Sequence, residues 1–148
     1  METPSLPEAF SLTVPVRARW SDGDLQGVVN NAVYMTLFEE ARHAYFTGLE
    51  QLEDNHFPFL LAQTNVLFIA PGRCGEVFDV ELATTRLGSS SFEQAYRIKS
   101  VSGEVLCTGQ ARLVCYDEAT GKSRPMTDAF RAAIEAFEAN ARGGVDAH

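Results

Sequence analysis

Alternating apolar and polar positions run through most of the chain and predict a protein rich in β-strands. From Phe10 to Trp20 every even position is apolar, whereas the odd positions include Arg17 and Arg19. This pattern is typical of a half-buried strand. Four more strands are expected at residues 62–69, 77–87, 92–101 and 105–116. Polar positions along one side of these strands predict an antiparallel sheet with one face in water.

The spacing of apolar residues changes after the two asparagines at positions 30 and 31. Between residues 33 and 52 apolar side chains recur every three or four positions, which predicts an amphipathic helix of about twenty residues. An asparagine at its start is a suitable N-cap. Glu39 lies on the polar face of this helix, where it can reach Arg42 or His43 one turn on.

A second, short helix is expected near the C-terminus. Thr127 is a suitable N-cap for it, Phe130, Ile134 and Phe137 lie on one stripe, and two glycines at residues 143–144 are expected to end it before a frayed tail. The order strand, long helix, four strands, short helix predicts an α+β fold in which a sheet packs on one long helix. A chain of 148 residues fits one domain spanning residues 1–148.

Composition and charge narrow the range of partners. The chain carries a formal charge of −8 and has a pI near 4.8, whereas nucleic-acid binding usually shows as a basic surface. The same charge argues against an anionic membrane surface. No apolar run is long enough to span a bilayer, and the first residues do not resemble a signal peptide. We therefore expect a cytoplasmic protein that binds neither nucleic acid nor membranes.

The cysteines and histidines suggest no redox or metal chemistry. Cys74, Cys107 and Cys115 are an odd number without close spacing, as expected for reduced, mostly buried thiols in the cytosol. Cys107 and Cys115 would lie about 27 Å apart along one straight strand and so cannot pair. None of the three histidines has a second ligand at a spacing typical of metal sites, so no metal is expected.

The loop between the first strand and the long helix holds the residues best suited to chemistry, because it carries two carboxylates, Asp22 and Asp24. The helix after it begins with free backbone N–H groups, which can stabilise a carbonyl oxygen as it gains negative charge. A carboxylate just before such a helix can act as a general base or a nucleophile. These features suit acyl transfer or hydrolysis, although loop aspartates are also common turn formers and helix caps.

A resemblance to a known family strengthens the hydrolase interpretation. The segment from Trp20 to Arg42 resembles the signature of hotdog-fold acyl-CoA thioesterases, in the branch related to 4-hydroxybenzoyl-CoA thioesterase. The matching residues are Trp20, Asp22, Asp24, Gly27, Val28, Val29, Asn30, Asn31, Tyr34, Phe38, Glu39, Ala41 and Arg42. The likeness extends over residues 12–125 and includes a Gly-x-Ser-Ser turn at residues 88–91. Many relatives have histidine where Val28 stands, and this departure removes a possible acid–base partner of Asp24.

The resemblance implies a fold and a site. The fold would be a hotdog, an antiparallel sheet of about five to six strands wrapped around the long helix, with residues 12–125 as its core and residues 126–148 as C-terminal helix and tail. Asp24 would be the catalytic nucleophile or general base, the backbone N–H near Asn31 would polarise the thioester carbonyl, and Asp22 would orient the loop. Further substrate contacts are expected from Gly27, Val28, Asn30, Tyr34, Arg86, Ser90, Ser91 and Arg124.

The resemblance also implies an assembly and a substrate. The site of hotdog proteins lies between two subunits, so the active unit would be a homodimer, and such dimers often pair again into tetramers. Coenzyme A would be part of the substrate, and no other cofactor is expected. Residues 84–124 hold six basic and four acidic side chains, whereas residues 1–60 hold three and nine. The phosphates of coenzyme A are therefore expected near the later strands, where arginines can bind them.

Two other functions are compatible with the same fold. Some hotdog proteins hydrate or dehydrate acyl thioesters, but they usually need an Asp–His pair, and Val28 takes the position of that histidine. A non-catalytic protein that binds or carries acyl thioesters is the second alternative, against which the retention of Asp24 argues. The acyl group is left open, because the ten Phe, four Tyr and one Trp suit an aryl or a fatty-acyl pocket equally well.

Overall fold

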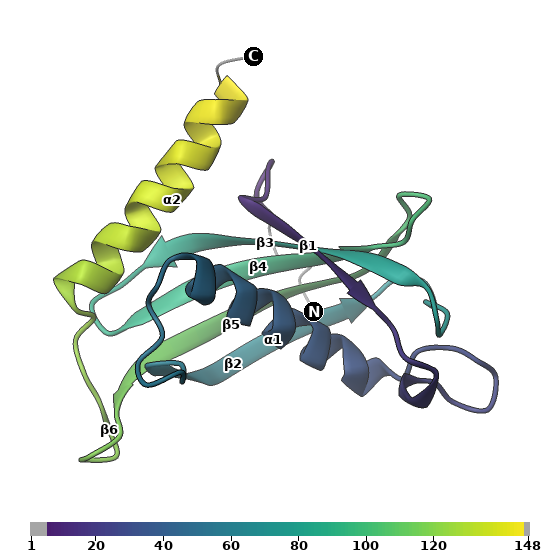
Figure 1. Cartoon of the computed structure of the whole chain (residues 1–148), viewed down its shortest axis with the longest axis horizontal. Coiled ribbons are helices and arrows are strands. Elements are labelled where there is room, and N and C mark those ends of the chain that lie inside the picture. Colours follow the sequence, from purple (N-terminus) through teal and green to yellow (C-terminus); the bar gives the residue numbers. More distant parts are fainter. Residues whose placement is uncertain (1–5, 147–148) are drawn as a thin grey trace.

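Residues 6–146 are described by the computed structural model, and they form one antiparallel sheet and two α-helices (Figure 1). The strands are β1 (Leu12–Arg17), β2 (Phe59–Phe68), β3 (Val77–Leu87), β4 (Ser91–Lys99), β5 (Val105–Asp117) and β6 (Lys122–Ser123). Their order is β1-β3-β4-β5-β2, with β6 beside the end of β5. The helices are α1 (Asn31–Gly48) and α2 (Asp128–Asp146), and a 3-10 helix, η1 (Trp20–Asp22), precedes α1. The predicted α+β order of elements is confirmed.

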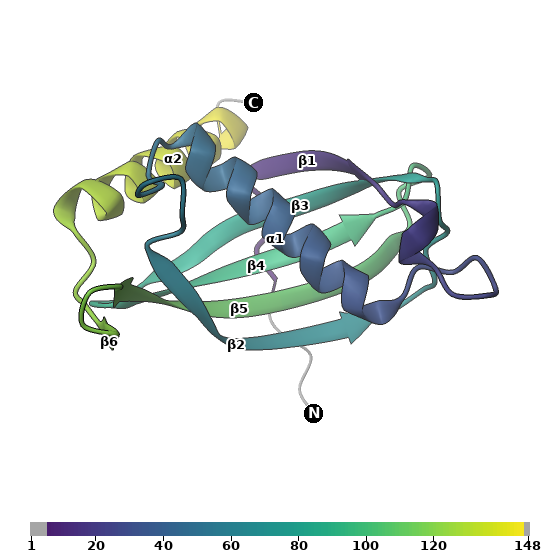
Figure 2. The same ribbon diagram turned by 60° about the horizontal axis from the view of Figure 1, so that its bottom comes forward.

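Helix α1 lies lengthwise along the concave face of the sheet, which curves around it (Figures 1 and 2). The predicted apolar stripe faces the sheet, because Tyr34, Leu37, Phe38 and further residues of that stripe are buried. The helix comes close to β5 at Gly109, where a Cβ atom would lie 2.9 Å from the ring of Phe38. A larger residue than glycine would therefore push α1 away from the sheet.

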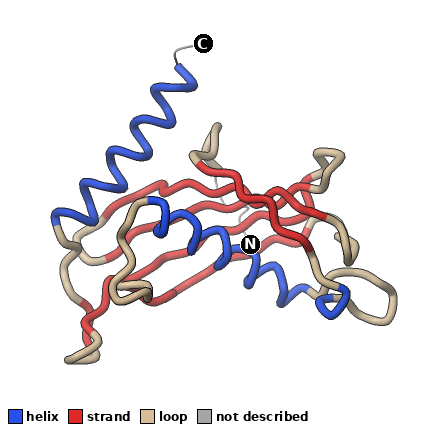
Figure 3. The backbone as a smooth tube through the Cα atoms, in the orientation of Figure 1, coloured by secondary structure: helices blue, strands red, loops and turns tan. Residues whose placement is uncertain are grey.

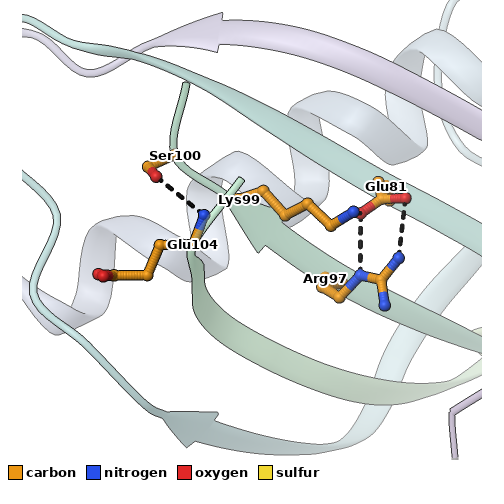
Figure 4. Close-up of polar contacts among 5 residues, drawn as sticks. All are labelled: Glu81, Arg97, Lys99, Ser100 and Glu104. Atoms are coloured by element: carbon orange, nitrogen blue, oxygen red, sulfur yellow. Dashed lines mark hydrogen bonds and ion pairs between the residues drawn. The ribbon is translucent and has the colours of Figure 1, made fainter. Parts of the chain in front are cut away.

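The strands alternate between the two faces of the sheet as the sequence predicts. In β4, Phe92, Gln94, Tyr96 and Ile98 are buried, whereas Arg97 projects from the opposite face (Figure 4). This alternation places one row of each strand under α1 and leaves the other row for polar contacts.

The polar face of the sheet carries a small ion cluster between β3 and β4 (Figure 4). The Arg97 guanidinium donates to both carboxylate oxygens of Glu81, at 2.9 and 3.1 Å, and Lys99 Nζ lies 3.4 Å from one of them. Partial burial acts to raise the pKa of Glu81, but the hydrogen bonds and charges of the two cations lower it overall. The two basic side chains of β4 are thus engaged within the sheet.

At the end of the sheet where α2 begins, aromatic residues join the two helices and the strands. The ring of Phe46 in α1 lies 4.9 Å from that of Phe59 in β2 and 5.4 Å from that of Phe130 in α2. The N-cap prediction for α2 is confirmed, since Thr127 Oγ1 accepts a hydrogen bond from the N–H of Phe130. Ile134, one turn further on, is fully buried. Most aromatic side chains therefore build the core.

Several predictions about element ends are wrong. Helix α1 ends at Gly48 rather than near residue 52, β2 begins at Phe59 rather than near residue 62, and β4 ends at Lys99 rather than near residue 101. Trp20, expected inside the first strand, belongs to η1 and is 80% exposed, because the chain leaves the sheet after Ala18, whose N–H pairs with Glu76. Helix α2 does not stop at residues 143–144 but continues to Asp146, since glycine weakens a helix by about 1 kcal/mol without breaking it. The predicted frayed end, residues 147–148, lies outside the described residues.

The predicted neighbourhood of Arg42 also differs. Arg42 is buried, and its Nε donates to the hydroxyl of Tyr96 at 2.9 Å. Within residues 6–146 it forms no ion pair with Glu39. Two positions on the helix surface can be neighbours by spacing, but the concave sheet encloses Arg42, and the Tyr96 hydroxyl accepts its hydrogen bond there.

No helix formed by residues 6–146 combines the length and the apolar character that crossing a membrane requires.

Candidate active site

Residues 22–30 form a narrow hairpin between η1 and α1, at the right-hand end of the molecule in Figure 1. The N–H of Asn30 donates to the carbonyl oxygen of Asp22 at 2.9 Å, and that of Asp24 to the carbonyl of Val28 at 3.0 Å. The tip closes with a hydrogen bond from Gly27 N–H to the Asp24 carbonyl at 3.1 Å. Gly27 has a φ of 77°, which glycine adopts without strain. The hairpin is therefore a well-defined turn.

The hairpin is also fastened to the segment that follows β2. The N–H of Val29 donates to the carbonyl of Gly72 at 2.8 Å, and the N–H of Cys74 donates to the carbonyl of Gly27 at 3.1 Å. These two bonds extend sheet-like pairing outward from the core. They hold the tip of the hairpin in a fixed position relative to β2 and β3.

Asp24 lies at the exposed tip of the hairpin with its carboxylate oriented by the loop. Its Oδ1 accepts hydrogen bonds from the backbone N–H groups of Gln26 at 2.8 Å and Val28 at 3.2 Å. Its Oδ2 accepts no hydrogen bond from any residue that the structure describes. One oxygen is thus fixed, and the other is available to take a proton or to attack a carbonyl carbon.

Asp22, in contrast, is buried and fully engaged. Its carboxylate accepts the backbone N–H of Arg19 at 2.8 Å and two guanidinium hydrogen bonds of Arg19 at 2.9 and 3.3 Å. The side-chain hydrogen bond from Arg19 is the main reason that the pKa of Asp22 is lowered. This is the loop-orienting role expected from the sequence, and it leaves Asp24 as the accessible carboxylate.

The start of α1 lacks the expected side-chain cap. Asn30 occupies the N-cap position, but its side chain forms no capping hydrogen bond. Its backbone is held by the hairpin, and its side chain is exposed. The first N–H groups of α1, beginning at the exposed Asn31, are therefore not covered by a capping side chain. Open N–H groups at the positive end of a helix suit an anion or a polarised carbonyl oxygen.

A cavity of about 240 Å³ opens beside this helix end. It is formed by the hairpin, the first turn of α1 and the chain after β2, and its lining residues are Val28, Val29, Asn31, Tyr34, Phe68, Ile69, Ala70 and Pro71. Three residues predicted as site residues, Val28, Asn31 and Tyr34, thus come together, whereas Asp24, Gly27 and Asn30 are not among the residues that line this cavity. Phe68 and Ile69 were not predicted, because they follow the strand pattern like their neighbours. Only their exposure at the end of β2 distinguishes them.

Tyr34 forms the rear of this cavity. It is buried, and its hydroxyl oxygen accepts the N–H of Gly72 at 3.0 Å. Burial raises the pKa of the Tyr34 phenol. The residue therefore acts as a neutral wall that ties α1 to the segment after β2.

The other predicted contacts lie at the opposite end of the sheet, at the left in Figures 1 and 3. The 88–91 turn joins β3 to β4 there, and its backbone is held by hydrogen bonds from Cys115 to Ser90 and from Gly88 to Ser91, both of 2.7 Å. The Ser90 and Ser91 hydroxyls form no hydrogen bond with residues in the described range. Within one chain, this turn and Asp24 lie at opposite ends of the sheet and therefore do not contact each other.

The basic residues expected near coenzyme A are largely paired already. Arg124 donates to Glu53 at 2.6 Å, and Arg112 lies 3.8 Å from Glu93. Arg97 and Lys99 are engaged in the cluster of Figure 4. Arg86 is exposed and forms no ion pair with the residues described. The basic excess counted along the sequence therefore overstates the positive charge available to a phosphate.

The cysteines are free thiols, and all three are buried. Burial raises the pKa of the Cys107 thiol to about 12, so it is not a thiolate nucleophile at neutral pH. Among the described residues, no three side chains of His, Cys, Asp or Glu gather in a way that could hold a metal ion. The carboxylate of Asp24 is left as the group best placed for chemistry.

Known proteins resemble this chain in sequence and in fold. A model of the thioesterase-like superfamily matches residues 18–134. A thioesterase structure from Thermus thermophilus, complexed with coenzyme A and Zn, is 32% identical with a TM-score of 0.79, over 90% of this chain and 98% of that one. The PA2801 protein of Pseudomonas aeruginosa, a putative thioesterase by its description, is 30% identical with a TM-score of 0.76, over 85% and 99% of the two chains.

The acyl-CoA thioester hydrolase YbgC of Escherichia coli O6:H1 is 26% identical over 117 residues, which are 76% of this chain and 87% of that protein. The family match includes the hairpin, α1 and strands β2 to β5, so it covers every element that positions Asp24. The chain therefore belongs to the thioesterase-like superfamily and is a thioesterase with the hotdog fold.

Proposed function

We propose that this chain hydrolyses acyl-CoA thioesters to a carboxylic acid and free coenzyme A, with Asp24 as the catalytic carboxylate. One observation carries the proposal: a carboxylate oriented by two loop N–H groups lies a few residues before an α1 N-terminus that has no side-chain cap. The T. thermophilus relative with bound coenzyme A and the E. coli acyl-CoA thioester hydrolase support the substrate class.

Two chemical routes use the same geometry. As a general base, Asp24 takes a proton from a water molecule that attacks the thioester carbon. As a nucleophile, Asp24 attacks that carbon itself, expels the coenzyme A thiolate and forms an anhydride, which water then hydrolyses. In both routes the carbonyl oxygen gains negative charge, which the N–H groups near Asn31 stabilise. The thiolate leaves and takes up a proton from solvent.

We infer that the active unit is a homodimer formed through β2. This strand is at the edge of the sheet, and Leu60, Leu61, Leu67, Phe68 and Ile69, on it or directly after it, are each 41–55% exposed. An unpaired edge strand with apolar side chains is a template for pairing with another chain. Antiparallel pairing of two β2 strands across a two-fold axis would extend the sheet through both copies.

This pairing explains why the predicted contacts are split between two ends. It sets the start of β2 in one copy beside the end of β2 in the other. The 88–91 turn of one copy would then face the Asp24 end of its neighbour, where Ser90, Ser91, Arg86 and Arg124 can contact coenzyme A. Assembly of two dimers into a tetramer stays a prediction. So does a cytoplasmic location, for which the buried free thiols are the support.

The test is release of free thiol from a panel of acyl-CoAs. Asp24→Asn and Asp24→Ala are expected to lower kcat by at least about a hundredfold, because both lose the base or nucleophile. Asp79→Asn is the matched control, since Asp79 is an exposed aspartate of β3. If Asp24→Asn hydrolyses thioesters as fast as the unmodified chain, Asp24 does not have this role.

A panel that includes acyl-carrier-protein thioesters also separates the alternatives. Tight binding without thiol release would favour the carrier function over hydrolysis. A single turnover in water labelled with heavy oxygen then tests for the nucleophilic route, because the position of the label in the products is measured. Label in the Asp24 carboxylate would establish the nucleophilic route, because water that opens the anhydride at Asp24 leaves its oxygen there, whereas the general-base route puts the label in the released acid.

A further inference from the structure

The ion pair between Arg124 and Glu53 bears on how tightly coenzyme A is held. We propose that Glu53 is a displaceable counter-ion of Arg124, so that a phosphate of coenzyme A must replace the Glu53 carboxylate, and that Glu53 thereby weakens the binding of both acyl-CoA and released coenzyme A. The inference rests on the proposed function, in which Arg124 contacts coenzyme A, and adds a residue that sets the affinity. Three features support it: the exposure of the ion pair, an unbonded nitrogen of Arg124 and the groups around the 88–91 turn.

The ion pair joins two fixed backbones but is itself open to water. Arg124 directly follows β6, at the left in Figure 1, and its Nη2 donates to Glu53 Oε2 at 2.6 Å. Glu53 is held by backbone hydrogen bonds of 2.8 and 2.9 Å with His56. The side chains of Arg124 and Glu53 are 30% and 55% exposed. Such exposed ion pairs contribute little free energy, so Arg124 can change its partner by side-chain rotation at a small cost.

Arg124 also has an unused donor. Its Nε is buried and has no hydrogen-bond partner among the residues that the structure describes. Arg97, in contrast, donates through two nitrogens to the two carboxylate oxygens of Glu81, which is the paired geometry that a guanidinium favours with carboxylates and phosphates. A buried donor without an acceptor is unfavourable. A rotation that brings two N–H groups of Arg124 onto one phosphate would remove this cost.

The backbone of Arg124 lies next to the 88–91 turn. Its N–H donates to the carbonyl of Cys115 at 3.0 Å, and the N–H of Cys115 donates to the carbonyl of Ser90 at 2.7 Å. The hydroxyls of Ser90 and Ser91 form no hydrogen bond within residues 6–146. Arg124 is therefore one residue away from two hydroxyl donors that can also bind phosphate oxygens.

A second arginine lies around the same point. Arg131 in α2 donates to the carbonyl of Gly88 in this turn. Burial raises the pKa of the Cys115 thiol. Among the charges that act on this thiol, those of Arg124 and Arg131 lower its pKa and that of Glu53 raises it, so all three charges are near it. A phosphate in the place of the Glu53 carboxylate would therefore be close to two guanidinium groups.

Calorimetric titration with free coenzyme A tests the exchange without catalysis. Glu53→Gln is expected to lower the Kd of coenzyme A by at least about threefold, because the competing carboxylate is lost. Arg124→Gln should raise this Kd by at least about tenfold, since charged hydrogen bonds to phosphate are lost. Glu118→Gln removes the same charge from an exposed residue between β5 and β6 and, as the matched control, should leave the Kd unchanged. A Kd that Glu53→Gln leaves unchanged or raises would overturn the inference.

The double variant of Glu53→Gln and Arg124→Gln distinguishes exchange at Arg124 from long-range repulsion. Its Kd for coenzyme A should equal that of Arg124→Gln alone, because the effect of Glu53 depends on the guanidinium that it occupies. A Kd in the double variant several times lower than that of Arg124→Gln would show that Glu53 repels coenzyme A directly. That result would overturn the inference.

Kinetics give a second readout, with the acyl-CoA from which the unmodified chain releases thiol fastest. Glu53→Gln should lower its KM and the inhibition constant of coenzyme A by a similar factor, because substrate and product carry the same phosphates. The matching S-acyl pantetheine has no phosphate, so its kcat/KM should not change. Thiol release with binding that does not respond to Glu53 would overturn the inference and leave the proposed function intact. A chain that neither binds coenzyme A nor releases thiol would overturn the proposed function itself.

Discussion

The position of Asp24 depends on a steric fit between Gly23, which precedes it in the chain, and Cys74, which packs against Gly23. Gly23, the residue before Asp24, packs against Cys74, and a Cβ atom on Gly23 would lie only 2.0 Å from the Cys74 sulfur. It would lie 3.6 Å from the Cys74 Cβ, an ordinary contact. The thiol thus occupies the space that glycine leaves open. Because the hairpin is bonded to Cys74 through Gly27, a clash at this point would displace Asp24.

A size exchange between these residues makes a sharp prediction at the residue scale. Gly23→Ala is expected to lower kcat by about a hundredfold with little change in KM, because displacing a catalytic group by about 1 Å has an effect of that size. Cys74→Ala alone should have a mild effect. The double variant should recover most of the lost kcat, because the alanine side chains then meet at an ordinary distance and the remaining close approach, 3.3 Å to the Val28 carbonyl oxygen, requires a shift of only a few tenths of an ångström. Steady-state kinetics of the three variants measure these changes in kcat. A double variant as slow as Gly23→Ala would contradict the steric account.

At the scale of elements, buried polar side chains link α1, two strands and α2. Consecutive hydrogen bonds of 2.5 to 3.1 Å join Arg42, Tyr96, Gln94, Thr84, Tyr45 and Glu138. Both charged ends of this series are buried. Glu138 Oε1 also accepts the N–H of Thr84 at 2.7 Å. A buried polar network of this kind stabilises one arrangement of the elements only while every member is satisfied.

Tyr45→Phe tests the contribution of this network to stability. Removing the Tyr45 hydroxyl deletes one of the hydrogen bonds that Glu138 Oε1 accepts, although those from Ser11 Oγ and the Thr84 N–H remain, and it leaves the Thr84 hydroxyl without its acceptor. The free energy of unfolding is expected to fall by about 1–3 kcal/mol. Tyr116→Phe is the matched control, because the structure shows Tyr116 bonded through its backbone. Urea unfolding at a fixed protein concentration measures both, and equal values for the two variants would show that the network contributes no stability.

At the scale of the whole molecule, the two ends of the sheet differ in kind. The end at α2 is filled by aromatic rings around Phe46, whereas the other end carries the exposed hairpin, the open start of α1 and the cavity. The edge strand β2 runs between them. If a second copy pairs along β2 in the antiparallel sense, the aromatic end of each copy lies beside the hairpin end of the other copy. The dimer therefore contains this arrangement twice. The proposed assembly and the proposed site are therefore linked.

Charges on the β2 edge test this link. Leu61→Lys combined with Leu67→Lys is expected to convert a dimer into a monomer, because lysine on an edge strand opposes pairing. Thiol release should be lost together with the dimer. Val101→Lys serves as the control, since Val101 is exposed but lies in the turn between β4 and β5 and not on β2. Analytical ultracentrifugation gives the oligomeric state, and a monomeric unmodified chain with full activity would contradict the proposed assembly.

Secondary structure and local chemistry follow from the sequence of this chain alone. Alternation predicted β3 and β5 to within one residue. The helical stripe predicted most of the buried residues of α1 but not Arg42 or Phe46, which are also buried. The motif around Asp24 predicted a loop carboxylate next to a helix start. These features depend on residues close together in the chain, where spacing maps directly onto one face of a strand or helix.

Which distant residues meet, in contrast, depends on how the elements pack. Spacing placed Arg42 near Glu39, but the curvature of the sheet buries Arg42 against Tyr96. The strand pattern did not distinguish Phe68 from its neighbours, and its place in the cavity depends on Val28 and Tyr34 arriving from other elements. The separation of Ser90 from Asp24 likewise depends on the direction in which each strand runs. Periodicity carries no information about such contacts, because they arise only when the chain closes on itself.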